Sequence, residues 1–367
     1  MDRQVILLLT IVCCASASID HKQITGLNKL LGLGDKAYAT CNIVLFTELV
    51  QYEEASANCK KFNLGAGLGE EGRLATVDDE EKNHDLMALL EKAYPIVDQD
   101  DKSPWTSKKW VWSGLRKTKN NDVVGLKRGD YDPLDWEWAD GSHPLDFQRW
   151  FNFDNRKKAQ PDQYSLKYGK KSSSDKKCDE KPRCYQNQMR INHDGLWDDT
   201  FKQLEHPYAC DYQGKYVLSK EQLKWVDAKE ACEEAGLHLA KIRSNEEVEE
   251  ILAAMVHFLG PVEELTEDNE WVDTNWLWVG GSDAGEEGTW VWTDGELVLP
   301  EKGSDWVFPW HEKKGNDNGS RKLRKKGGQD ALSFSRWGEF DDSHIDNMET
   351  MRPFACQCPE DVGLHIH

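Results

Sequence analysis

The side chains best suited to chemistry in this 367-residue chain are its cysteines and its carboxylates. Two of the ten cysteines, Cys13 and Cys14, stand in an apolar N-terminal stretch, which leaves eight. Eight is an even number, and none of these cysteines has the Cys-x-x-Cys spacing typical of zinc sites. We therefore expect disulfide bonds among the eight, which are Cys41, Cys59, Cys178, Cys184, Cys210, Cys232, Cys356 and Cys358.

The carboxylates give the chain a strong negative charge. Asp and Glu number 66 against 46 Lys and Arg, a net charge of −20. Such a chain repels nucleic acid and anionic membranes at long range and attracts cations such as calcium. The sequence has no GxSxG, P-loop or HExxH motif, and the carboxylates are too numerous to single out a catalytic pair. We expect a binding protein, not an enzyme, with no nucleic-acid partner.

The first residues are typical of a secretory signal peptide. Arg3 precedes an apolar run from Val5 to Val12, and the small residues Ala15-Ser16-Ala17 follow. The run is far shorter than the roughly 20 residues that a membrane-spanning helix needs. We therefore expect cleavage after Ala17, no membrane span, and a secreted, extracellular protein, where cysteines form disulfides.

The rest of the chain repeats itself once. Six sequence blocks occur twice in the same order, about 150 residues apart, which is too long a period for a solenoid repeat. The sequence therefore predicts a signal peptide (1–17), an N-terminal segment (18–36), two domains (37–212 and 213–359) and a C-terminal tail (360–367). The paired blocks are Tyr52–Cys59 with Trp225–Cys232, Arg73–Val77 with His238–Ile242, Trp112–Gly114 with Trp278–Gly280, Trp136–Gly141 with Trp290–Gly295, Gly195–Asp199 with Gly338–Asp342, and His206–Cys210 with Arg352–Cys356.

The elements that position these residues follow one plan in each copy. An amphipathic helix ends near Cys59 or Cys232, with the cysteine on its inner face. A second helix begins after a capping signal, at Ser244 in one copy and at Asp78 in the other. Short strands with alternating tryptophans, Asp-Gly turns and long polar loops follow, and a last strand carries the terminal cysteine. The fold class is therefore α+β. Because the join near 211–214 is short, we expect the copies to lie close together.

These motifs closely resemble those of the C-type lectin-like domain. The resemblance covers nearly all of the chain after the signal peptide and implies two tandem domains of this family. It also implies that the first helix is bonded to the last strand in each copy, by Cys59–Cys210 and Cys232–Cys356. Each bond would close a loop of well over 100 residues, which the loop-entropy model values at about 4–5 kcal/mol.

The remaining four cysteines leave alternatives open. Cys184 occupies the first position of the family's inner disulfide, but its usual partner is missing, and Cys178 is the replacement we expect. Cys41 and Cys358 lie near the two ends of the folded region. They either bond to each other, which we favour slightly, or join two chains in a homodimer.

The resemblance also implies a calcium and sugar site in the first copy. In this family, Gln-Pro-Asp in the long loop and two residues after the strand tryptophan hold Ca²⁺ and select galactose-type sugars. Gln160, Asp162, Asp198 and Asp199 stand at those positions, and Glu180 is the nearest replacement for a ligand lost at Pro182. Asp198 stands where asparagine is usual. The alternative is that Gln160-Pro161-Asp162 is an ordinary turn.

The second copy lacks the triplet, and we expect no calcium-sugar site there. Asn318 begins an Asn-Gly-Ser glycosylation sequon in its long loop. Basic residues concentrate in both long loops, ten from Arg156 to Arg183 and seven from Lys313 to Lys326. Two functions follow: a secreted, calcium-dependent, glycan-binding lectin acting in immune recognition, or a calcium-independent structural or adhesive protein whose basic loops bind anionic glycans, proteins or mineral.

Overall fold

The computed structural model describes residues 21–61, 72–95, 110–118, 133–150, 188–212, 214–260, 272–286, 288–298, 308–310, 330–343 and 350–359. The expected signal peptide and tail lie outside these residues, as do Gln160, Asp162, Cys178, Glu180, Cys184 and Asn318.

The first half of the chain builds a seven-stranded sheet with order β1-β2-β7-β3-β5-β6, in which β4 pairs with β3. Neighbouring strands are antiparallel except for β3 and β7, which are parallel. The elements are α1 (His21–Leu31), β1 (Ala37–Ala39), β2 (Ile43–Val50), α2 (Tyr52–Lys61), α3 (Glu80–Ala93), β3 (Trp110–Lys117), β4 (Trp136–Glu137), β5 (Gln188–Asn192), β6 (Trp197–Thr200) and β7 (His206–Asp211).

The second half builds a six-stranded sheet with order β12-β11-β10-β13-β8, in which β9 pairs with β13. Here β10 and β13 are the parallel pair. The elements are β8 (Tyr216–Leu223), α4 (Trp225–Glu234), β9 (His238–Leu239), α5 (Asn245–Leu259), β10 (Trp276–Ser282), β11 (Ala331–Ser335), β12 (Phe340–Ser343) and β13 (Arg352–Gln357).

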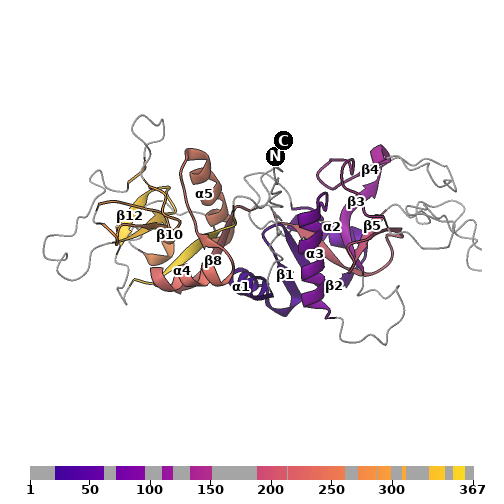
Figure 1. Ribbon diagram of the computed structural model, residues 1–367, viewed down its shortest axis with the longest axis horizontal. Coiled ribbons are helices and arrows are strands. Elements are labelled where there is room, and N and C mark those ends of the chain that lie inside the picture. The colour runs from indigo at the N-terminus through magenta and orange to yellow at the C-terminus, as the bar shows by residue number, and fades with distance from the viewer. Residues whose placement is uncertain are drawn as a thin grey trace, which may run out of the picture.

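The two sheets share one strand order, because β2-β7-β3-β5-β6 corresponds to β8-β13-β10-β11-β12. Equivalent backbone contacts recur. Gly114 N donates to Ala75 O at 2.8 Å, and Gly280 N donates to Ala240 O at 2.9 Å. Figure 1 shows the two sheets at opposite ends of an elongated molecule, each with its helices packed against it. The predicted α+β fold class is confirmed.

The helices begin close to where the sequence predicts. Ser244 caps α5 by accepting a hydrogen bond from the Glu247 amide. In the first half the capping residue is Asp79, which accepts from the Lys82 amide, so the prediction of Asp78 was wrong by one residue. Asp78 instead forms an ion pair with the Lys82 ammonium at 2.7 Å.

The tryptophans form the cores of the two halves, as expected. Trp112, Trp138, Trp278 and Trp292 are all buried. The strands at Trp136 and Trp290 are short, as the sequence predicted. β4 ends at Glu137, and in the second half only Val291 makes bridges, with Ser282 and Leu297.

Three disulfide bonds join described cysteines. Cys59 bonds to Cys210 and Cys232 to Cys356, as the family resemblance implied. Cys41 bonds to Cys358, with Cα atoms 5.9 Å apart, so the alternative in which these cysteines join two chains is not what the structure contains.

The two halves share one hydrophobic core at their junction, as the short join predicted. Its members come from both halves and from α1, a helix that the sequence analysis did not predict. Leu27 and Leu30 of α1 pack in the same cluster as Val44 of the first half and Phe354 of the second. A Cβ atom on Gly26 would lie 2.8 Å from Ala235 Cα, so α1 needs glycine where it approaches α4.

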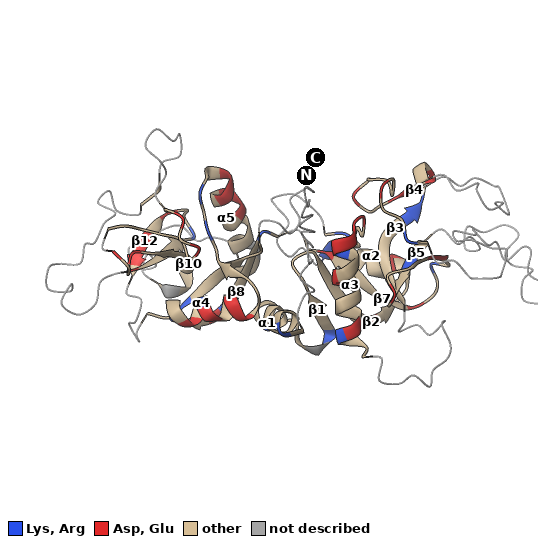
Figure 2. Ribbon diagram, in the orientation of Figure 1, with Lys and Arg blue, Asp and Glu red and all other residues tan. Residues whose placement is uncertain are grey.

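Charged residues cover the helices on their outer faces. Figure 2 shows acidic residues at the start of α5 and α3 and along α4. Glu80 and Glu81 in α3, and Glu246 and Glu247 in α5, lie in the first turn, where a negative charge is favourable. Among the described helices, none has the length and apolar character needed to cross a membrane.

Candidate functional site

Asp198 and Asp199 follow Trp197 on β6, at the outer end of the first sheet. Successive strand residues point to opposite faces, so the two carboxylates face different surroundings. Asp198 lies directly across from Arg190 on β5, and Asp199 lies across from Met189. The strand thus brings together the two described members of the expected calcium site, but it points them away from each other.

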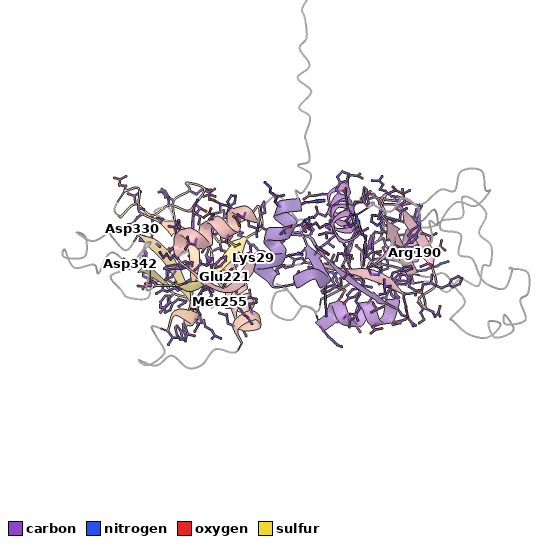
Figure 3. The ribbon with its side chains drawn as sticks, turned by 90° about the horizontal axis from the view of Figure 1, so that it is seen from below. Lys29, Arg190, Glu221, Met255, Asp330 and Asp342 are labelled. Atoms are coloured by element: carbon purple, nitrogen blue, oxygen red, sulfur yellow. A yellow bond between two sulfur atoms is a disulfide. The ribbon has the colours of Figure 1, made fainter. Side chains whose placement is uncertain are left out.

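The Asp198 carboxylate is bound by an arginine. Arg190 donates from Nε and Nη2 to Asp198 Oδ2, at 2.9 and 2.7 Å. Both side chains are almost fully buried, with exposed fractions of 6% and 3%. Figure 3 labels Arg190 among the packed side chains of the first half. Burial lowers the pKa of the guanidinium, and the adjacent Asp198 opposes that shift. This is a charge-assisted pair with two hydrogen bonds.

Aromatic rings complete the surroundings of this pair. The Arg190 guanidinium carbon lies 4.3 Å from the centre of the Trp110 ring. Its Nη1 lies 3.1 Å from Nε2 of His206, and the His206 ring meets the Trp112 ring edge to face. A cation over an aromatic face is attracted by the ring quadrupole, so these rings hold the guanidinium in place.

Asp199 is fully buried and has a lysine nearby. The registers align Arg116 with Gln188 and Gln188 with Thr200, which places Lys117 and Asp199 on the same face of the sheet. Burial lowers the pKa of the Lys117 ammonium, and the carboxylates of Asp135 and Asp199 oppose this shift. Each carboxylate of β6 is therefore near one basic side chain.

Calcium sites in proteins need several oxygen ligands that converge on one point. Of the expected ligands Gln160, Asp162, Glu180, Asp198 and Asp199, the structure describes only the last two. Asp198 is held by Arg190 on one face and Asp199 lies on the other. The described part of the donor set does not fit calcium. No group of three or more His, Cys, Asp or Glu side chains in the described residues is arranged to hold a metal ion.

The second half differs at both basic positions. Asp341 and Asp342 follow Phe340 on β12, and Ser333 lies across from Asp341, in the place of Arg190. Asp283 follows β10, where Lys117 stands at the end of β3. Figure 3 labels Asp342 and Asp330 at the opposite end of the molecule from Arg190. The same strand thus has different charges around it in the two halves.

An arginine nevertheless lies over the core tryptophans of both sheets. In the second half it is Arg352, at the position of His206, with its guanidinium carbon 4.8 Å from the centre of the Trp278 ring. Arg352 donates to Ser343 Oγ at 2.9 Å. The arginine thus lies on β5 in the first half and on β13 in the second, and in both halves it lies over core tryptophans. The sequence analysis missed Arg190 and Arg352; a cross-strand alignment of the short hairpin from 188 to 200 would have found the first.

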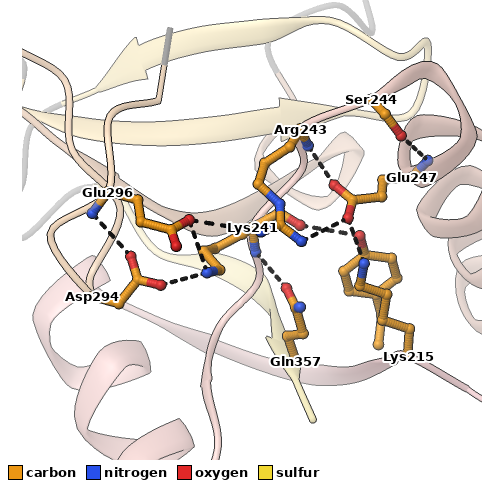
Figure 4. Close-up of polar contacts among 9 residues, drawn as sticks. Lys215, Lys241, Arg243, Ser244, Glu247, Asp294, Glu296 and Gln357 are labelled. Atoms are coloured by element: carbon orange, nitrogen blue, oxygen red, sulfur yellow. Dashed lines mark hydrogen bonds and ion pairs between the residues drawn. The ribbon is translucent and has the colours of Figure 1, made fainter. Parts of the chain in front are cut away.

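A second cluster of charges lies where the second half begins (Figure 4). Glu247 accepts from Lys215 at 2.5 Å and from Arg243 Nη2 at 3.2 Å. Lys241 contacts Asp294 and, at 3.3 Å, Glu296. Burial alone would lower the pKa of Lys241, but its two hydrogen-bonded carboxylates outweigh burial and raise that pKa. The three cations of this cluster are paired with three carboxylates, so their charges cancel. The ion pairs connect the start of β8, the first turn of α5 and the turn that contains Asp294.

Comparison with known proteins identifies part of the chain. Residues 221–347 match the family described as "Lectin C-type domain". The CD209 antigen of Homo sapiens is 32% identical over 118 residues, which are 32% of this chain and 23% of that protein. The CD209 antigen of Macaca mulatta is 31% identical over 154 residues, 42% of this chain and 29% of that protein. The matches thus span about a quarter of the length of these relatives.

Two solved structures are also similar to part of the chain. The human scavenger receptor C-type lectin carbohydrate-recognition domain is 22% identical and aligns over 39% of this chain and 88% of its own, with a TM-score of 0.28. A calcium-independent type II antifreeze protein is 21% identical over 38% of this chain and 82% of its own, with a TM-score of 0.26. The family match and the relatives thus identify residues 221–347 as similar to a lectin C-type domain.

Proposed function

We propose that this chain is a secreted, non-enzymatic, glycan-binding protein with two tandem C-type lectin-like domains. The observation that carries the proposal is the family match at residues 221–347. The first sheet supports its extension to the first half, because strand order and the helix-to-last-strand disulfide are the same in both halves. The signal-like residues 1–17 support secretion, and innate immune recognition is the role we propose for a secreted lectin of this kind.

The ligand surface we propose is the outer end of the first half, next to β5 and β6. The triplet Gln160-Pro161-Asp162 favours galactose-terminated glycans held through calcium, with Glu180 and Asp199 as further oxygen donors. The basic residues between 156 and 183 favour a second mode at this end, in which anionic glycans bind without calcium, and those between 313 and 326 favour the same mode in the second half. The Arg190–Asp198 pair is the structural observation in favour of this second mode.

A glycan panel separates these modes. The purified mature protein is applied to neutral, galactose-terminated and sulfated glycans, once with calcium and once with EGTA. We expect saturable binding to at least one glycan class, and galactose-terminated glycans are the first candidates. Binding only to sulfated glycans that falls steeply between 50 and 500 mM salt (roughly a tenfold change of ionic strength) would assign recognition to the basic loops. Absence of binding to every glycan in both buffers would refute the proposed function.

A further inference from the structure

We infer that the first half binds its ligand without calcium, because Arg190 and Lys117 occupy the place of the metal charge beside the two carboxylates of β6. The inference rests on the proposed glycan-binding function and concerns the same end of the molecule. It departs from the calcium-dependent mode that Gln160-Pro161-Asp162 alone would favour.

Arg190 satisfies Asp198. The guanidinium gives Asp198 two hydrogen bonds, at 2.9 and 2.7 Å, inside a nearly closed environment. It is itself fixed by the Trp110 ring on one side and by His206 on another. To bind calcium, Asp198 would have to leave Arg190, and the guanidinium would then stay buried beside a divalent cation.

Lys117, on β3, lies on the same face of the sheet as Asp199. The pairing of β3, β5 and β6 places Lys117 and Asp199 on one face, with Met189 between their strands. Lys117 also lies near Asp135, so its ammonium stands among carboxylates that would otherwise attract a metal ion. A positive charge on this face repels Ca²⁺ and lowers the affinity of Asp199 for it.

Basic side chains lie on both faces of the sheet beside the carboxylates of β6. Arg190 is bound to Asp198, and Lys117 shares the face of Asp199. In the second half, the equivalent positions are Ser333 and Asp283, an uncharged and an acidic residue. Both halves share one strand order, but only the first half has basic residues at these two positions, Arg190 and Lys117. The strand order therefore does not require them.

The test compares the wild-type protein with Lys117→Met, Lys117→Arg and Asp199→Asn. Thermal unfolding is measured in calcium and in EGTA, and glycan binding is measured in the same two buffers. If the domain binds calcium, free calcium at a concentration a hundred times the Kd should raise the Tm of a domain of this size by roughly 5–10 °C. Lys117→Arg is the matched control, because it keeps the positive charge.

We expect wild-type glycan affinity to agree within about twofold between the two buffers, a margin well below the tenfold that 1.4 kcal/mol represents. The wild-type calcium response should also equal that of Asp199→Asn, which shows that any bound ion lies elsewhere. Lys117→Met should gain a calcium-induced rise in Tm, and Lys117→Arg should not.

Three results would overturn the inference. The first is wild-type glycan binding that is lost in EGTA. The second is a wild-type rise in Tm with calcium that disappears in Asp199→Asn. The third is a Lys117→Met protein that gains no calcium response, which would remove the role assigned to Lys117. Failure to bind any glycan in either buffer would instead refute the proposed function on which the inference rests, so the two failures are distinguishable.

Discussion

The buried pair of Arg190 and Asp198 gives the sharpest prediction for the stability of the first half. Changing Arg190→Met removes two hydrogen bonds to a carboxylate whose exposed fraction is only 3%. It also removes the cation from the face of Trp110. Breaking a buried ion pair by deleting one partner typically costs about 3–5 kcal/mol, because the remaining charge stays buried.

The magnitude can be read from unfolding experiments. In urea, with disulfides intact, we expect the free energy of unfolding of Arg190→Met to fall by about 3–5 kcal/mol, equivalent to a Tm lower by roughly 6–15 °C. The double variant Arg190→Met/Asp198→Asn removes the stranded charge as well. It should therefore recover part of the loss, with a coupling energy of about 1–3 kcal/mol between the two sites.

The two side chains would lie in solvent, and not in the described pair, if the effects of the two substitutions were additive. The same conclusion would follow if Arg190→Met lowered the free energy of unfolding by less than about 1 kcal/mol. Because Ser333 stands across from Asp341 in the second half, Ser333→Ala is the matched control and should cost at most about 1–2 kcal/mol for its hydrogen bond to the Asp341 carbonyl.

Three further predictions concern the junction and pH. Cys41→Ser should lower the free energy of unfolding by about 3–4 kcal/mol, because the Cys41–Cys358 bond closes a loop of about forty residues once the chain is traced through the other two disulfides. A thiol assay of the variant should detect Cys358 as a new free thiol. Gly26→Val should lower stability by about 1–3 kcal/mol in urea unfolding, because its side chain would meet the backbone of α4, whereas the exposed Thr25→Ala on the same helix should change it little. Burial raises the pKa of Asp211 to about 6, so the contribution of its protonated form to stability is complete below about pH 4 and is lost as pH rises through 6. The free energy of unfolding of Asp211→Asn should therefore rise relative to that of the wild type between pH 4 and 7. The opposite trend would contradict the raised pKa.

Much of the fold could be predicted from short-range sequence signals. The capping box at Ser244 and the apolar spacing before Cys59 and Cys232 are local, and the helices form where these signals stand. The pairs Cys59–Cys210 and Cys232–Cys356 followed from the family resemblance. The repeated blocks predicted two copies of one domain, and the two sheets have the same strand order.

Helix α1 was missed for a physical reason. Its apolar stripe, Ile24, Leu27 and Leu30, has helical spacing, but the helix is only 11 residues long and does not stand alone. It is stabilised by residues of the second half, such as Phe354, which lie more than three hundred positions later in the sequence. The sequence of residues 18–36 alone does not predict that contact.

The site was harder to predict than the fold. The family resemblance identifies Asp198 as an expected ligand but does not predict which residue lies across from it. Only the register of β5 against β6 places Arg190 on Asp198, and only the end of β3 brings Lys117 to the face of Asp199. Because two basic residues from separate strands changed the electrostatics, the motif and the structure favour different modes of binding.

The most direct test of this account is the affinity of the mature protein for its best galactose-terminated or sulfated glycan, measured in calcium and again in EGTA. We predict binding in both buffers, with Kd values that agree within about twofold, a difference of less than 1 kcal/mol. A Kd at least tenfold weaker in EGTA would contradict the account, because it would show that calcium, and not Arg190 and Lys117, supplies the positive charge at the ligand site.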